Sequence, residues 1–209
     1  MFGGNAPSPT ARSFVLAPGA SAWREIARMP GPRSQAAAAP IAGRVFVFGG
    51  YDGARLVAPT YAYDIARDAW REVAAIPTQR DHLAGAALLG RACAVGGRRL
   101  SLTTNLPTLE CYDPQRDVWE KLPDAPTARG GVGAAVIGDR LVFVGGEQPS
   151  GTYREVEIYE PRGWVRIADL PTPRHGIGVV AIGSTVYVMS GGPTPGASQT
   201  PVCEAITLQ

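Results

Sequence analysis

The sequence has few of the residues that mark metal centres and disulfide-rich proteins. Among its 209 residues there are three cysteines and two histidines, and no CxxC motif or Cys/His cluster is present. We therefore expect neither a metal nor a cofactor. Three cysteines cannot form a complete disulfide framework, so Cys93, Cys111 and Cys203 are predicted to be buried free thiols, because free cysteine packs as a small hydrophobe.

Charge and hydropathy exclude two further classes of partner. The net charge is +2 and the charges are scattered, so nothing resembles the basic stripe of a nucleic-acid-binding protein. No apolar run approaches the roughly 20 residues that a membrane-spanning helix needs, so no membrane partner is expected. The first five residues lack the charged and then apolar regions of a signal peptide, which favours a cytoplasmic location unless an export signal lies outside this piece.

One structural unit is repeated along the chain. Pairs of glycines recur at intervals of 46, 47, 49 and 46 residues, and tryptophans recur at intervals of 47, 49 and 45 residues. A fixed period of this length is typical of repeat architectures, so we assign both markers to the structural repeat. The markers are Gly3-Gly4, Gly49-Gly50, Gly96-Gly97, Gly145-Gly146 and Gly191-Gly192, with Trp23, Trp70, Trp119 and Trp164.

Each repeat contains four strand candidates, and the copy from Pro77 to Pro123 shows them most clearly. The second strand is a continuous apolar run, as in Val45–Phe48, which indicates that both of its faces are covered. The third strand, as in Val156–Glu160, alternates apolar and polar residues and is predicted to be partly exposed. Small sheets that repeat in this way predict a β-propeller, whereas a parallel solenoid usually has shorter repeats without hairpin turns.

The order of the markers resembles the kelch repeat, in which an apolar strand ends in Gly-Gly and is followed by Tyr-Asp and then Trp. The chain carries Tyr63-Asp64 before Trp70, Tyr112-Asp113 before Trp119, and Tyr159-Glu160 before Trp164. The resemblance covers nearly the whole chain. It implies an all-β, kelch-type propeller, as in galactose oxidase, with four-stranded antiparallel blades.

The resemblance also implies a single domain, residues 1–209, of about four or five blades. Because six or seven blades are usual in the family, the propeller is expected to be partial or truncated. The blades are placed at residues 33–73, 79–122, 128–168 and 174–208. Kelch propellers commonly complete one blade from both termini, so residues 20–26 would complete the last blade. The alternative count leaves an opening unit without its inner hairpin, and such an unclosed arc predicts a homo-oligomer.

An arginine precedes each inner strand. One arginine per blade at one end of the ring would gather positive charge at the mouth of the channel, which suits an acidic peptide or a small acidic molecule. The alternative is that each guanidinium holds a loop between blades by donating to carbonyl oxygens. The four residues are Arg33, Arg80, Arg129 and Arg174.

Further candidate binding residues lie where the repeats differ. Two residues after each arginine stand Gln35, His82, Gly131 and Gly176, and in peptide-binding kelch domains this position often points into the rim of the pocket. His175 lies in the same segment. Tyr51 and Arg98 belong to the variable loops that follow the glycine pairs, and loops on a rigid scaffold are usual sites of recognition. For any one of these residues a bystander role remains the alternative.

These observations favour a non-catalytic module that binds a protein or peptide, with loops at the channel mouth as the site. The main alternative is a kelch enzyme similar to a sugar mutarotase or epimerase, which would use polar residues such as Arg80, His82, Arg129 and Glu147. A copper oxidase is disfavoured, because two isolated histidines do not provide its metal ligands. A third interpretation is a spacer or assembly unit whose free edges pair with a second copy.

Overall fold

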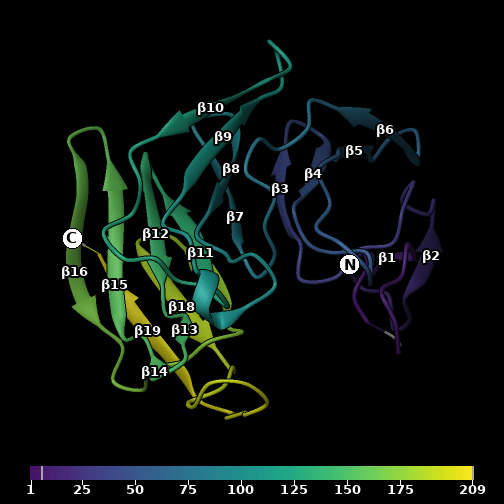
Figure 1. The fold of residues 1–209 in the computed structure, drawn as a ribbon. Helices are drawn as coiled ribbons and strands as arrows, with labels where there is room; N and C mark the ends of the chain where they lie inside the picture. The colour runs from purple at the N-terminus through teal and green to yellow at the C-terminus, as the bar shows by residue number, and fades with distance from the viewer. Residues whose placement is uncertain (6, 209) are drawn as a thin grey trace.

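The computed structural model describes residues 1–5 and 7–208, and almost all of its regular structure is β-strand. The elements lie around a common axis in chain order (Figure 1). An opening sheet consists of β1 (Ser13–Val15) and β2 (Arg24–Ile26). The first blade consists of β3 (Ala37–Ile41), β4 (Arg44–Phe48), β5 (Thr60–Asp64) and β6 (Ala69–Val73).

The other sheets follow the same antiparallel pattern. The second blade consists of β7 (Ala84–Leu88), β8 (Arg91–Val95), β9 (Leu109–Asp113) and β10 (Val118–Leu122), with the short 3-10 helix η1 (Leu102–Thr104) in a loop. The third blade consists of β11 (Gly133–Ile137), β12 (Arg140–Val144), β15 (Glu155–Glu160) and β16 (Gly163–Asp169), with a small hairpin of β13 (Glu147–Gln148) and β14 (Gly151–Thr152). The last blade consists of β17 (Gly178–Ile182), β18 (Thr185–Met189) and β19 (Cys203–Thr207).

The hydrophobic core lies in the seams between successive blades. Phe46 of the first blade packs on Tyr112 of the second, with ring centroids 5.2 Å apart, and both side chains are buried. Phe143 of the third blade belongs to the same cluster as Leu109 of the second. A third cluster joins the third and last blades. Face-to-face packing of small sheets about an axis makes the fold a β-propeller.

The glycine pairs lie where two loops approach the end of the second strand. A Cβ atom on Gly49 would be 2.8 Å from the carbonyl oxygen of Arg80 in the next blade, and one on Gly50 would be 2.5 Å from that of Ser34. Both glycines also have positive φ angles, +63° and +83°. A side chain at either position would therefore clash as well as strain the backbone.

Tryptophans of the fourth strands join each blade to the preceding sheet. The Trp70 Nε1 group donates to the Ala27 carbonyl oxygen at 2.8 Å, and the Trp119 Nε1 group donates to that of Ala74 at 2.9 Å. Trp164 makes the equivalent bond to Pro123. Trp23 lies in the segment before the opening sheet's second strand and is 55% exposed.

The two ends of the chain do not pair with each other, although residues 20–26 were expected to complete the last blade. β2 pairs with β1 in an antiparallel hairpin, whereas β17, β18 and β19 form a sheet of three strands. The β1–β2 hairpin closes a short loop at a small cost in chain entropy. Pairing of β2 with β19 would cost more, because it would join segments from opposite ends of the chain. The structure therefore contains an incomplete opening unit, as in the alternative count.

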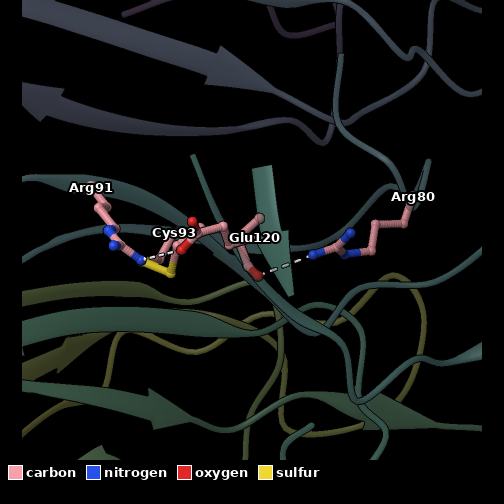
Figure 2. The surroundings of a disulfide bond; sticks show 6 residues. Arg80, Arg91, Cys93 and Glu120 are labelled. Atoms are coloured by element: carbon pink, nitrogen blue, oxygen red, sulfur yellow. Dashed lines mark hydrogen bonds and ion pairs between the residues drawn. A yellow bond between two sulfur atoms is a disulfide. The ribbon is translucent and has the colours of Figure 1, made fainter. Parts of the chain in front are cut away.

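The expectation of three buried free thiols is wrong. Cys93 of β8 and Cys111 of β9 are directly opposite each other, with Cα atoms 4.0 Å apart, and they form a disulfide that is fully buried. Figure 2 shows this bond with Arg91 on one side and Arg80 on the other. Cys203 is free, as expected, but it is exposed on β19. Sequence spacing did not indicate this pairing, because the two cysteines are brought together by the register of β8 with β9.

The only helix among the described residues is the short η1, and no helix there has the length and apolar character needed to cross a membrane.

Candidate binding site at the mouth of the propeller

The four repeated arginines are buried inside the blades rather than exposed at the mouth. Arg80 donates to the carbonyl oxygens of Gly96 (2.7 Å) and Ala94 (3.0 Å), and it forms an ion pair of 2.6 Å with Glu110. Its side chain is completely inaccessible to solvent. Burial lowers the pKa of Arg80, and the nearby carboxylate of Glu110 partly offsets this effect.

The other three arginines have the same role. Arg129 and Arg174 are ion-paired with Glu157 and Glu204, and both are fully buried. Among the residues that the structure describes, no carboxylate forms an ion pair with Arg33, which instead donates to the Gly49 and Pro59 carbonyl oxygens. Its guanidinium also lies over the ring of Tyr61. All four guanidinium groups are therefore buried and bonded within the propeller, the arrangement that the structural alternative predicts.

The variable residues next to these arginines and glycine pairs lie at one end of the axis. In the first three blades, the residue after the arginine forms a β-bridge with the residue after the glycine pair, and in the last blade it does so with the second glycine of the pair. We call these positions, together with the next residue after each arginine, the mouth. The bridged pairs are Ser34 with Tyr51, Asp81 with Arg98, Gly130 with Glu147, and His175 with Gly192.

Backbone hydrogen bonds connect the mouth from blade to blade. The His82 amide donates to the Gln35 carbonyl oxygen at 3.0 Å, the Gly131 amide to that of His82 at 2.8 Å, and the Gly176 amide to that of Gly131 at 2.7 Å. Gln35 and His82 thus occupy one repeated position of the mouth, Tyr51 and Arg98 occupy a second, and His175 occupies a third. The backbone of the mouth is therefore held by hydrogen bonds between blades, whereas the side chains on it differ from one blade to the next.

Two of these side chains are held on a backbone that favours glycine. The φ angles at Gln35, His82, Gly131 and Gly176 are +46°, +51°, +68° and +60°. A non-glycine residue in this left-handed region costs about 1 kcal/mol. Two blades have the glycine that this conformation favours, whereas the first two blades carry a glutamine and a histidine. Strain at a repeated position of this kind is typical of functional sites.

A buried carboxylate, Asp81, holds the mouth of the second blade. Its Oδ2 atom lies 2.9 Å from His82 Nδ1, and its Oδ1 atom accepts from the Leu100 amide at 3.1 Å. Burial raises the pKa of Asp81, but the hydrogen bonds of His82 and Leu100 and the charge of Arg98 outweigh burial and lower it. Asp81 is therefore a carboxylate at neutral pH. Within the described residues, the other imidazole nitrogen of His82, Nε2, has no hydrogen-bond partner.

A second buried carboxylate, Glu147, joins three blades. It accepts from Arg98 Nη1 of the second blade at 2.8 Å and from the Gly196 amide of the last blade at 2.9 Å. His175 Nδ1 lies 3.4 Å from the same carboxylate, and its Nε2 atom faces the Thr194 carbonyl oxygen. Glu147 therefore fixes the position of both basic side chains.

The acidic groups of the mouth lie beneath the basic ones. The side chains of Asp81 and Glu147 are 4% and 2% exposed, whereas those of His82, Arg98 and His175 are 28%, 11% and 12% exposed. Arg99, in the loop that follows Gly96-Gly97, is also exposed, whereas the exposed Arg55 pairs with Asp52 of its own loop at 3.5 Å. At the second, third and last blades, a ligand that approaches the mouth therefore meets cations and imidazoles before it meets carboxylates.

The sequence points to Glu147, as a residue of a variable loop and of the enzyme alternative, but it does not point to Asp81 as a site residue. Comparison of the residue after each arginine would have drawn attention to Asp81, because the corresponding residues are Ser34, Gly130 and His175. In the described part of the chain, no three His, Cys, Asp or Glu side chains are placed to hold a metal ion.

Comparisons with known proteins agree with this architecture. Residues 1–146 match the KLHDC2/KLHL20/DRC7 Kelch-repeats domain, and the chain belongs to this kelch-repeat family. A solved structure titled "Structure of YjhT" is similar, with a TM-score of 0.73 and 16% sequence identity. The match covers 91% of this chain and 75% of that one, and at this identity it shows the fold alone. No curated protein has a significant sequence match to the chain.

Proposed function

We propose that this kelch propeller is a non-catalytic binding module that holds an acidic segment of a partner protein at its mouth. The observation that carries the proposal is the layering of charge, with Asp81 and Glu147 buried and the basic side chains above them. The buried carboxylates orient the imidazoles and Arg98, and the exposed cations attract an acidic ligand.

The rigidity of the mouth supports a binding role. Backbone hydrogen bonds run between neighbouring blades, and Glu147 is bonded to the second and last blades. A preorganised surface loses little conformational entropy when a ligand binds. Most of its ionisable groups already have partners, which suits a fixed recognition surface.

A selection from a random peptide library on the intact chain tests this proposal. We expect the selected peptides to be enriched in Asp and Glu, and their affinity to decrease as ionic strength rises. Charge reversal at Arg99 should weaken the binding of a selected peptide, measured by fluorescence anisotropy. The matched control is Arg162→Glu, at an exposed residue of the β15–β16 turn, which should bind like the unchanged chain.

Two results would contradict the proposal. One is a selection without enrichment of acidic residues. The other is a selected peptide that binds Arg99→Glu and Arg162→Glu with equal affinity.

One observation favours a second candidate, a sugar mutarotase or epimerase. An imidazole oriented by a carboxylate, as His82 is by Asp81, is the arrangement that a general base needs. Polarimetry of freshly dissolved glucose, galactose and sialic acid tests this candidate. An enzyme would accelerate the approach to anomeric equilibrium, and His82→Gly would abolish the acceleration. Under the binding proposal, neither protein changes the rate.

A further inference from the structure

We infer that the mouth recognises an acidic side chain that has an apolar side chain next to it, through His82 and Leu100 respectively. This inference rests on the proposed function, and it specifies which acidic segments bind. Asp81 positions both recognising residues, because one carboxylate oxygen faces the imidazole of His82 and the other accepts from the amide of Leu100. The two residues therefore lie against the same buried group.

Leu100 is an apolar side chain presented to solvent by an anchored loop. It is 56% exposed, and its φ angle is +63°, which is uncommon for a bulky residue. The loop is held on both sides of it, because Arg98 forms β-bridges with Asp81 and Asn105, and the Thr104 hydroxyl donates to the Arg99 carbonyl oxygen at 2.9 Å. The exposure of Leu100 is thus a consequence of a defined conformation.

His82 provides the polar half of the pair. Its Nδ1 atom donates to Asp81, so Nε2 is the atom that remains for a ligand, and it donates to a ligand carboxylate when the imidazole carries both protons. Arg98 approaches the same carboxylate closely enough to lower its pKa, and the exposed Arg99 follows it in the loop. An acidic side chain bound at His82 would therefore lie near these arginines, and the exposed Leu100 belongs to the loop whose amide is bonded to the same carboxylate.

The fold requires neither side chain. Glycine occupies the positions equivalent to His82 in the third and last blades, with the same sign of φ. Leu100 is mostly exposed, so removing its side chain leaves no large cavity in the core. Both side chains therefore persist on strained backbone without a packing reason. Leu89 in the β7–β8 turn shares this strain, so it is their place beside Asp81 at the mouth that points to a ligand.

Four capped, fluorescein-labelled peptides of equal length test the inference by fluorescence anisotropy. They are alternating copolymers of Glu with Leu, Glu with Ser, Gln with Leu, and Gln with Ser. We expect the Glu–Leu peptide to bind the unchanged chain most tightly. Leu100→Gly should lower its affinity about tenfold, to that of the Glu–Ser peptide, because burial of one leucine accounts for about this factor.

Leu89→Gly is the matched control. Leu89 is also an exposed leucine with positive φ, but it lies in the β7–β8 turn, at the other end of the inner strands from the mouth. Its replacement should leave the binding of all four peptides unchanged. Circular dichroism and thermal unfolding should show that both glycine variants are folded.

The outcomes separate this inference from the proposed function. If the Glu peptides bind better than the Gln peptides but Glu–Leu and Glu–Ser bind equally, the inference is wrong and acidic binding stands. Equal effects of Leu100→Gly and Leu89→Gly also overturn it. If no Glu peptide binds better than its Gln counterpart, both the inference and the acidic-ligand proposal are wrong.

Discussion

At the scale of single residues, repetition separates side chains that build the propeller from side chains that distinguish its blades. The arginines are the same in every blade and are buried, as expected for a structural role. His82 and Asp81 differ from their counterparts, and they lie at the mouth. Sequence spacing placed both sets in the same segment, but it could not show whether a side chain points into the blade or toward solvent.

The structural role of the arginines gives the first prediction. Arg80→Met would leave the buried carboxylate of Glu110 without its cation and several carbonyl oxygens without a donor. Loss of one partner from a buried ion pair costs about 3–5 kcal/mol, so urea unfolding should show a decrease of this size in the free energy of unfolding. The double variant Arg80→Met, Glu110→Leu should recover part of it. A decrease below about 1 kcal/mol for Arg80→Met would show that the guanidinium is not a structural anchor.

At the scale of strands and sheets, the repeat motif accounts for how neighbouring blades are joined. Asp68 accepts from the Tyr63 hydroxyl at 2.7 Å and from the Ala27 amide at 2.9 Å, so this one carboxylate connects the first blade to the opening sheet. Asp117 makes the same pair of bonds to Tyr112 and Ala74. The bonds of these acids across the seam depend on packing that sequence spacing does not encode.

Alkaline pH should weaken this junction. Burial and the hydrogen bond to Asp68 raise the pKa of Tyr63 to about 12. Because the folded-state pKa lies above the unfolded value, the contribution to stability is complete below about pH 10 and is lost as the pH rises toward 12. Tyr63→Phe should remove this part of the pH dependence, measured by urea unfolding between these limits. An unchanged profile would contradict the assignment.

The disulfide also belongs to this scale, because it links adjacent strands of one blade. Thiol titration of the unreduced, denatured chain should detect one free cysteine, Cys203. For a sequence separation of 18 residues, reduction should lower the free energy of unfolding by about 3 kcal/mol. Cys203→Ser serves as the control and should leave this decrease unchanged. Detection of three free thiols would contradict the pairing.

At the scale of the whole molecule, the fold was predictable and the ends of the arc were not. Periodic glycine pairs and tryptophans encode local contacts that recur in every blade. The partner of β2, by contrast, depends on competition between a nearby strand and a distant one. The disulfide likewise depends on the register of β8 with β9, which the sequence pattern did not fix.

The last blade has a face that no other sheet covers within the described residues. Val180, Ile182 and Met189 are exposed there, with Ile182 at 65%. Exposed apolar faces promote association, so light scattering should show an apparent mass that rises with concentration. Ile182→Asp should reduce this rise, and Ile65→Asp, at an exposed isoleucine on the β5–β6 turn, should not. A monomer of constant mass for the unchanged chain would contradict the expectation.

The central claim is that the mouth keeps strained side chains because they bind a ligand. Replacement of His82 by glycine, the residue of the equivalent positions Gly131 and Gly176, tests it most directly when stability and peptide affinity are measured on the same protein. We predict a free energy of unfolding within about 2 kcal/mol of the unchanged chain, because relief of strain partly offsets the greater freedom of glycine when unfolded and the lost hydrogen bond to buried Asp81. The affinity for a selected acidic peptide should fall at least tenfold. A folded His82→Gly protein that binds the peptide as tightly as the unchanged chain would contradict the claim.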